Sequence, residues 1–279
     1  MENRKYSSRV EGGPKKRFDK PKYFSKNNDF KQSKPVIAFG VQSVLETLRS
    51  EDKFAGKEID KILLQREFGH SEVETLAKER GVPVQRVPVE KLNRVTMKNH
   101  QGVIAFISAV NYAQMSNIVA DVFEKGEVPL ILVLDRITDV RNFGAIARTA
   151  ECSGVHAIVV PARGGSQVNE DAMKTSSGAL NYLPVCREND LVAAIEELKM
   201  SGFSIVACTE KSDKNIYGAA LNGPTAIVMG SEEDGISDRI LELSDERVKI
   251  PMFGNVGSLN VSAATAVLLY EVVRQRTQE

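Results

Sequence analysis

The residues best suited to chemistry in this chain begin with a polar cluster that follows an apolar run near its centre. Residues 135–148 read DRITDVRNFGAIAR and include Asn142, Gly144 and Arg148. A guanidinium stays protonated and donates several hydrogen bonds in one plane, so Arg148 can hold a phosphate or a developing negative charge. Asn142 is placed to cap the next helix, and Gly144 lets a ligand or another segment approach closely. Spacing alone equally allows an exposed helical arginine that pairs with Glu151.

A second cluster, MGSEEDG at 229–235, follows another apolar run. The predicted strand ends at Gly230, where the missing side chain allows a ligand to contact the backbone. Glu232 is the first of three consecutive carboxylates. Such a group is as consistent with an acidic turn at the start of a helix, where negative charge is favourable, as it is with a binding site.

The third cluster lies at 250–262 and reads IPMFGNVGSLNVS. It places Ser258 and Asn260 directly before the last apolar helix. A hydroxyl group in this position is also a good N-cap, so Ser258 has a purely structural alternative. All three clusters stand where an apolar strand gives way to a loop or helix, and α/β sheets build their ligand sites at such strand ends.

The elements that must position these clusters alternate regularly from residue 129 to residue 279. Short apolar runs separated by helical patterns predict an α/β fold with a mostly parallel sheet and helices on both faces. We expect strands at 130–135, 155–161, 203–209, 225–230 and 247–251. Helices are expected at 143–154, 190–202, 237–244 and 258–276.

A smaller α/β pattern precedes this region at 35–110. It predicts helices at 41–49, 71–81 and 89–95 and strands at 61–65, 82–88 and 102–108. Residues 111–128 are interpreted as a linker with one short helix. His100 stands in a turn before the last of these strands, where local hydrogen bonding is the simpler interpretation and recognition of a base is the alternative.

Charge is distributed unevenly, although the formal net charge of the whole chain is zero. Residues 1–34 hold eleven of the 37 Lys and Arg residues but only four of the 37 Asp and Glu residues. Isolated aromatic residues are interspersed among these charges, and no helical or strand period is present. This pattern predicts a disordered basic arm suited to RNA, through phosphate charge and base stacking. A solubilising tail is the alternative interpretation.

Several classes of protein are disfavoured. The three cysteines and three histidines are scattered, so no zinc site is expected, and unpaired cysteines suit a reducing cytoplasm. No apolar run is long enough to span a bilayer, and no signal-peptide core is evident. Neither a GxxxxGK[ST] nor a GxGxxG pattern is present, which argues against a P-loop, a Rossmann dinucleotide site and a Rossmann-type small-molecule methyltransferase.

Taken together, the three clusters resemble the signature motifs of the SpoU-type RNA ribose 2′-O-methyltransferases of the SPOUT superfamily. The first matches NxGAxxR, the second matches GxExxG and the third contains SLN. Residues 35–110, through FGVQSVLETL and NHQGVIAF, resemble more loosely the small substrate-binding domain of these enzymes. The resemblance implies a trefoil knot in the C-terminal domain at 129–279, a homodimer, and S-adenosylmethionine as the methyl donor.

The resemblance also implies which residues form the site. The implied catalytic residues are Arg148, Asn142, Glu232, Ser258 and Asn260. The implied contacts of the methyl donor are Gly230, Ile250 and Leu259, with Thr209 as a further candidate. No metal is implied. Arg148 would stabilise an alkoxide, grip the adjacent phosphate, or take part in a phosphate-assisted proton transfer.

The expected reaction is methylation of a ribose 2′-hydroxyl in structured RNA. The pairing of a small α/β domain with this C-terminal domain looks most like the bacterial 23S rRNA guanosine-2′-O-methyltransferases. A tRNA-directed enzyme is the alternative substrate class. A non-catalytic RNA-binding factor of ribosome assembly is the alternative of another kind, although such a factor would be expected to have lost motif residues that are all present here.

Overall fold

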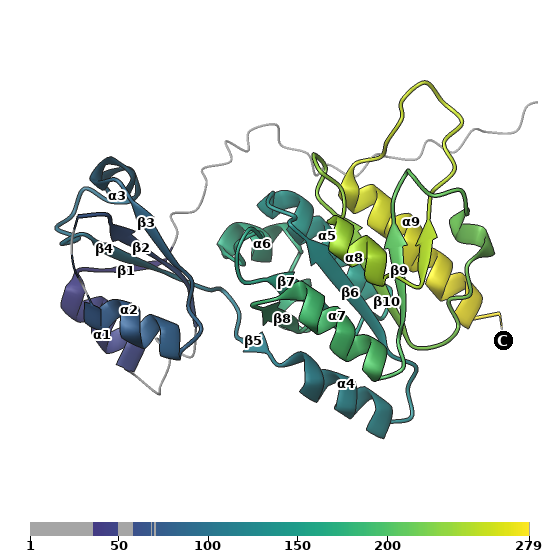
Figure 1. Ribbon diagram of the computed structural model, residues 1–279, viewed down its shortest axis with the longest axis horizontal. Coiled ribbons are helices and arrows are strands. Elements are labelled where there is room, and N and C mark those ends of the chain that lie inside the picture. Colours follow the sequence, from purple (N-terminus) through teal and green to yellow (C-terminus); the bar gives the residue numbers. More distant parts are fainter. Residues whose placement is uncertain (1–35, 50–57, 68, 70, 279) are drawn as a thin grey trace, which may run out of the picture. The chain divides into compact units, whose positions relative to one another are not determined.

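The computed structural model describes residues 36–49, 58–67, 69 and 71–278. The basic arm predicted at 1–34 lies outside the described residues. The described chain forms a sheet of four strands and a sheet of seven strands, each with its own helices (Figure 1). The fold is therefore of the predicted α/β class.

The four-stranded sheet has the order β1 (Ile37–Phe39), β4 (Val103–Ile107), β2 (Ile59–Gln65) and β3 (Val84–Val87). β1 and β2 run antiparallel to β4, whereas β3 runs parallel to β2. One face is covered by the apolar stripes of α1 (Val41–Arg49) and α2 (Ser71–Glu79), and the other by Leu92 of α3 (Val89–Val95).

His100 lies in the turn before β4 and is buried. Its Nδ1 accepts a hydrogen bond from the Gly102 backbone N–H at 3.0 Å, and its Nε2 lies 2.9 Å from Oδ1 of Asn93. These contacts are the local hydrogen bonds predicted for this residue.

The seven-stranded sheet is parallel throughout. Its order is β11 (Glu246–Val248), β9 (Ser204–Cys208), β10 (Thr225–Gly230), β6 (Leu130–Asp135), β7 (Ala157–Pro161), β8 (Val185–Glu188) and β5 (Tyr112–Ala113). Its central strands are nearly continuous apolar runs because helices cover both faces. Leu132 of β6 packs into one core, and the next residue, Val133, packs into the other.

The helices of this sheet divide between its two faces (Figure 1). One face carries α5 (Val140–Cys152), α6 (Glu170–Thr175) and α9 (Val261–Arg276). The other carries α4 (Met115–Glu124), α7 (Leu191–Met200) and α8 (Asp238–Leu243). None of the helices in the described residues is long and apolar enough to cross a membrane. The trefoil knot implied by the resemblance stays a prediction.

Several elements differ from those expected. Residues 111–128, interpreted as a linker with a short helix, contain β5 and α4. β5 pairs with β8, and α4 buries Met115 and Val119 against the sheet. The strands β1, β5 and β8 and the helix α6 were not expected, because they are short and β8 reads VCRE, with two polar residues. Contacts with neighbouring elements, and not local sequence patterns, give these segments their regular structure.

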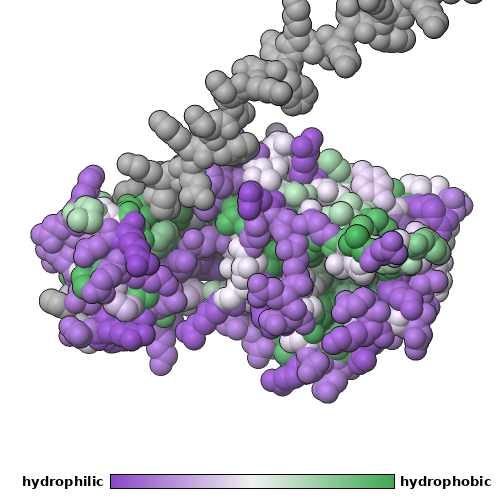
Figure 2. Space-filling model, turned by 90° about the horizontal axis from the view of Figure 1, so that it is seen from above, coloured by the Kyte–Doolittle hydropathy of each residue, from purple (hydrophilic) through white to green (hydrophobic). Residues whose placement is uncertain are grey.

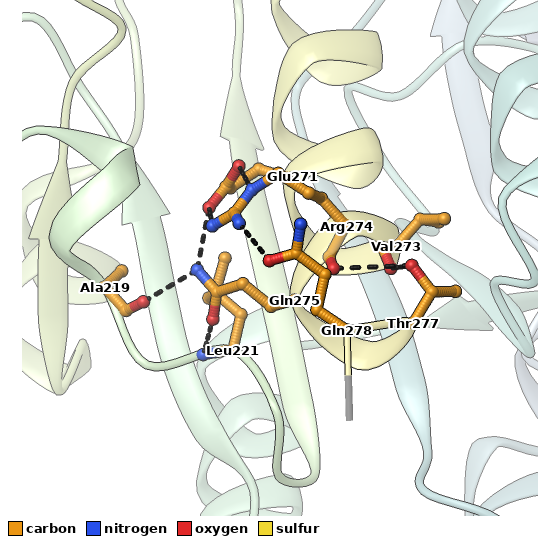
Figure 3. Close-up of polar contacts among 8 residues, drawn as sticks. All are labelled: Ala219, Leu221, Glu271, Val273, Arg274, Gln275, Thr277 and Gln278. Atoms are coloured by element: carbon orange, nitrogen blue, oxygen red, sulfur yellow. Dashed lines mark hydrogen bonds and ion pairs between the residues drawn. The ribbon is translucent and has the colours of Figure 1, made fainter.

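The C-terminal end of α9 is fastened to the segment before β10 by polar side chains (Figure 3). Gln275 donates to the Ala219 carbonyl at 3.0 Å and accepts from the Leu221 backbone N–H at 2.9 Å. The buried carboxylate of Glu271 accepts from Arg274 and from Gln275. The hydrogen bond from Arg274 holds the pKa of Glu271 below its ordinary value.

Arg276 completes this attachment. Its guanidinium donates to four backbone carbonyls at 2.8 to 3.2 Å, those of Val128, Pro129, Leu221 and Gly223. These carbonyls precede β6 and β10, so the end of α9 is held at the amino edge of the sheet. The start of α9 lies at the opposite, carboxyl edge, where the site is found.

Candidate active site

The carboxyl ends of β6, β9 and β10 share one edge of the sheet, at the point where the strand order reverses. β7 and β8 extend the sheet on one side of β6, whereas β10, β9 and β11 lie on the other side. Asp135 at the end of β6 is the register partner of Gly230 at the end of β10. Ligands of open α/β sheets bind in the crevice that forms at such a reversal.

Asn142, Glu232 and Asn260 form a closed set of hydrogen bonds at this edge, which we call the Asn–Glu–Asn cluster. Oε1 of Glu232 accepts from Nδ2 of Asn142 at 3.0 Å and from Nδ2 of Asn260 at 2.9 Å. Nδ2 of Asn260 also donates to Oδ1 of Asn142 at 3.1 Å. One residue from each of the three predicted motifs thus meets the others, and Oε2 of Glu232 keeps no partner among the described residues.

The helix that carries Asn142 begins at Val140, three residues earlier than expected. Its N-cap is Asp139, whose Oδ1 accepts from the backbone N–H groups of Arg141 at 2.7 Å and Asn142 at 3.4 Å. The bond from the Arg141 backbone lowers the pKa of Asp139. The prediction that Asn142 caps this helix is therefore wrong. Because Asn142 lies in the first turn, its side chain reaches Glu232 instead.

The last helix begins at Val261 rather than at Ser258. Its N-cap is Asn260, whose Oδ1 accepts from the Ser262 backbone N–H at 2.9 Å. The structural alternative for Ser258, capping this helix, is therefore wrong. Asn260 serves two purposes at once, because its Oδ1 caps α9 while its Nδ2 donates to Glu232.

The loop that carries Glu232 folds back onto the end of β10. A Cβ atom at Gly230 would lie 2.2 Å from the carbonyl carbon of Gly235. A glycine is therefore required here by the loop itself. Gly144 is required in the same way, because a Cβ atom there would lie 2.7 Å from Cβ of Thr175 on α6. The close neighbour of Gly144 is thus a segment of the same chain.

Arg136 holds this loop in place, although no motif drew attention to it. Its guanidinium donates to Oδ1 of Asp135, to Oδ2 of Asp234 and to the Gly235 carbonyl, each at 3.2 Å. Its backbone has a φ of +60°, which is unusual for a residue other than glycine. Such strain persists where surrounding contacts enforce it. Asp234 and Gly235 lie 98 and 99 positions away along the chain, so only the fold could reveal this role.

A cavity of about 290 Å³ opens beside the Asn–Glu–Asn cluster, and we call it the first cavity. All four residues predicted as cofactor contacts line it, namely Thr209, Gly230, Ile250 and Leu259. Three of the predicted catalytic residues line it as well, namely Glu232, Ser258 and Asn260. Cys208 forms part of the wall, and burial raises the pKa of its thiol to about 12, so the thiol is uncharged at neutral pH.

Arg148 lies apart from the first cavity. It is exposed on α5, and its guanidinium makes no hydrogen bond or ion pair with any described residue. The alternative pairing with Glu151 is therefore not present. The structure brings four of the five predicted catalytic residues together and leaves Arg148 on the surface. In the part of the chain that is described, no group of three or more His, Cys, Asp or Glu side chains could hold a metal ion.

Comparisons with known families match both sheets. Residues 129–270 match the SpoU rRNA Methylase family, and residues 37–113 match the family described as RNA 2′-O ribose methyltransferase substrate binding. The chain belongs to the SpoU rRNA methylase family. The SpoU match includes the Asn–Glu–Asn cluster and all the residues that line the first cavity, so the site described above lies within the family's own region.

A similar protein is YacO of Bacillus subtilis (strain 168), which is assigned to the TrmH family of tRNA/rRNA methyltransferases. It is 35% identical to this SpoU-family chain over 237 residues. The matched region covers 85% of the chain and 94% of the relative, so the similarity extends over both the four-stranded and the seven-stranded part.

Solved structures of SpoU methyltransferases share the fold. AviRb from Streptomyces viridochromogenes, solved in complex with the cofactor AdoMet, matches with a TM-score of 0.56 and 24% identity. That match covers 88% of this chain and 92% of AviRb, and at this identity it concerns the fold alone. The TrmH/SpoU tRNA modifying enzyme of A. aeolicus matches at 31% identity with a TM-score of 0.50, covering 58% of this chain and 84% of that one.

Proposed function

We propose that this SpoU-family chain methylates the 2′-hydroxyl of a guanosine ribose in 23S rRNA, with S-adenosylmethionine as methyl donor. The observation that supports this best is the first cavity, which opens beside the Asn–Glu–Asn cluster. The family description, an rRNA methylase, and the AdoMet bound by AviRb support it as well. A tRNA substrate is the second candidate, because YacO is assigned to a family of tRNA/rRNA methyltransferases.

The residues of the first cavity fit this cofactor. Met229, Ile250 and Leu259 provide apolar walls suited to an adenine ring, and the polar side chains of the lining, such as Thr209, can set its orientation. The carboxylates of Glu210 and Glu232 suit hydroxyl groups and positive charge. S-adenosylmethionine supplies a methyl group bound to a positively charged sulfur and therefore open to attack by a nucleophile.

The chain's own residues act on the hydroxyl that attacks. In the proposed reaction a bond would form between the 2′-oxygen and the methyl carbon as the sulfur–carbon bond breaks, and the hydroxyl proton would pass to solvent or to the adjacent phosphate of the RNA. Asn142 and Asn260, held by Glu232, would orient the ribose, and Ser258 would shape the cavity near it. Arg148 would stabilise the developing alkoxide or hold the adjacent phosphate, because a permanently charged group is better suited to this role than to that of a base.

The position of Arg148 supports a homodimer in which each copy completes the site of the other. The loop after β11 carries Met252, Phe253, Val256 and Leu259, and Phe253 is 95% exposed. Figure 2, which looks down on this loop, shows hydrophobic surface toward this end of the molecule. Apolar side chains gathered at the surface mark interaction sites. We therefore expect a second copy to cover this loop.

Mixed dimers test this arrangement. If Arg148 acts in the partner's site, a mixture of Arg148→Ala and Asn260→Ala subunits regains one intact site in each mixed dimer, although either variant alone is inactive. If Arg148 acts in its own subunit, the mixture stays inactive. Light scattering of the purified protein reports whether a dimer forms at all, and a monomer would contradict the proposal.

We place the enzyme in the cytoplasm, together with its RNA. The substrate is tested with RNA from cells that lack the gene. We expect the purified chain to transfer a radiolabelled methyl group to 23S rRNA, and sequencing-based mapping to locate it on one guanosine ribose. Methylation of tRNA alone would favour the second candidate. Calorimetric titration with S-adenosylmethionine should give heat, whereas a non-catalytic assembly factor would give none.

A further inference from the structure

A second cavity of about 290 Å³ adjoins the Asn–Glu–Asn cluster and is distinct from the first. Its walls come mainly from the loop after β6, the first turn of α5 and the loop after β10, with Gly164 and Val261 completing them. The two cavities share Ser231, Glu232 and Val261. Glu232 therefore stands in the wall between them, and Asn142 donates to it from the side of the second cavity.

The walls of the second cavity are predominantly acidic. Asp139, Glu233 and Asp234 join Glu232 there, and Arg136 is the single cation among its described lining residues. Asp139 is occupied as the N-cap of α5, and Asp234 is paired with Arg136. Four carboxylates near one guanidinium disfavour a phosphate by charge repulsion. A ligand with N–H donors is the better match.

Two polar side chains of the second cavity have no partner among the residues that the structure describes. Glu233 is exposed and makes no hydrogen bond or ion pair with a described residue, and the Thr138 hydroxyl is equally unpaired. Both are therefore available to a ligand. Neither belongs to the set of residues assigned to the methyl donor or to catalysis.

We propose that the second cavity binds the nucleoside that receives the methyl group, with the edge of its base against Glu233. This inference rests on the proposed function, because the acceptor must approach from a side that the donor leaves open. Guanine is the base that fits best. It presents two neighbouring donors, N1–H and the N2 amino group, which match the two oxygens of one carboxylate, and unpaired RNA bases are read at this edge.

The first test fills the second cavity. Thr138→Phe places a ring in it without altering a residue that lines the first cavity. With RNA from cells lacking the gene as substrate, we expect the KM for RNA to rise at least about tenfold, as for a substrate group that no longer fits its pocket. The dissociation constant of S-adenosylmethionine should stay within about twofold. Thr277→Phe, at the exposed end of α9, is the matched control, and an unchanged KM in Thr138→Phe overturns the proposal.

The second test asks what Glu233 reads. A synthetic RNA carrying guanosine or inosine at the mapped nucleotide differs only in the N2 amino group. We expect the wild-type chain to prefer guanosine about tenfold or more in kcat/KM, because a site that hydrogen-bonds a substrate group rejects an analogue that lacks this group. Glu233→Ala should lose this preference, whereas Glu196→Ala, the same change of charge on the exposed side of α7, should keep it.

The outcomes distinguish failure of the second-cavity assignment from failure of the proposed methyltransferase function. Equal guanosine-to-inosine ratios in the wild type and in Glu233→Ala overturn the assignment of the second cavity, as does mapping of the methyl group to a nucleotide other than guanosine. Both results leave the RNA methyltransferase activity itself intact. A wild-type chain that binds S-adenosylmethionine but methylates no RNA overturns the proposed function and this inference together.

Discussion

The two edges of the seven-stranded sheet use polar side chains in different ways. At the carboxyl edge, the Asn–Glu–Asn cluster is open to solvent, and one carboxylate oxygen of Glu232 has no partner in the part of the chain that the structure describes. At the amino edge, Arg276 donates to four backbone carbonyls. α9 joins the two, because it begins at the Asn260 cap and ends at Arg276. One helix thus begins at polar side chains that are open to solvent and is fixed by contacts with the backbone at its other end.

The difference shows how the site can be both open and well positioned. Hydrogen bonds among side chains at the carboxyl edge leave donors and acceptors that a ligand can use. The bonds at the amino edge are made to backbone groups that precede β6 and β10, so they hold α9 in register with these strands. We therefore expect substitutions at the two edges to separate activity from stability.

The largest expected effect is the loss of activity in Asn142→Ala. The substitution removes one donor to Glu232 and leaves the lining of the first cavity intact. We expect kcat for RNA methylation to fall about 100-fold, which is the typical cost of removing one positioned hydrogen-bonding group from an enzyme active site. The thermal midpoint should hardly change, because this side chain is only partly buried. Asn181→Ala, another surface asparagine, is the control, and near-wild-type turnover in Asn142→Ala would argue against the cluster.

At the amino edge the expected effect is on stability. Arg276→Ala removes four hydrogen bonds from a charged donor, so we expect the free energy of unfolding to fall by about 2 kcal/mol, allowing for the partial exposure of the side chain. The folded fraction should keep its wild-type kcat. Urea unfolding measures the first quantity, and Arg239→Ala on α8, whose side chain has no partner among the described residues, should cost less than about 0.5 kcal/mol. If Arg276→Ala lost activity without losing stability, the amino edge would serve catalysis, which contradicts the expected difference between the two edges.

A helix cap at the carboxyl edge should affect both properties. Asp139→Ala removes the N-cap of α5 and should cost about 1 kcal/mol at neutral pH. The folded-state pKa of Asp139 is lowered, so its contribution is present above its unfolded pKa and is lost as the pH falls through the folded value. The stability difference from the wild type should therefore begin to shrink as the pH falls below about 4, the unfolded pKa, and should be lost below the lowered folded-state pKa.

A second capping aspartate sharpens that prediction. Asp190 caps α7 in the same way, so Asp190→Ala should cost a similar free energy of unfolding. Activity should be reduced in Asp139→Ala alone, because only that cap precedes Asn142. Equal activities in the two variants would show that the first turn of α5 does not need its cap to position Asn142.

The smallest expected effect concerns the three cysteines. Cys152 is exposed, whereas burial raises the pKa of Cys186 and of Cys208 to about 12. A thiolate is the reactive form, so a disulfide reagent at pH 8 should modify one thiol per native chain. Cys152→Ser should abolish the reaction. Modification of a second thiol would show that the first cavity opens in solution, since Cys208 lies in its wall.

The accuracy of prediction from sequence varied with the kind of element. The strand at 225–230 and the helices at 41–49 and 89–95 were predicted with their observed bounds, because continuous apolar or periodic runs indicate them directly. The starts of α5 and α9 were misplaced because two candidate caps stand within three residues of each other. At α5, Asn142 donates to Glu232 and Asp139 caps the helix, whereas at α9, Asn260 does both.

The order of residues along this chain determined the alternation of strands and helices, the α/β class and the three motifs, because all of these depend on neighbours within a few positions. Only the tertiary structure decided that Asn142 reaches Glu232 rather than capping α5, that Arg136 holds a loop about a hundred residues away, and that Arg148 stands outside the first cavity. Each of these depends on contacts between distant segments, and hydrogen bonds of that kind form only after the sheet has brought the ends of its strands together.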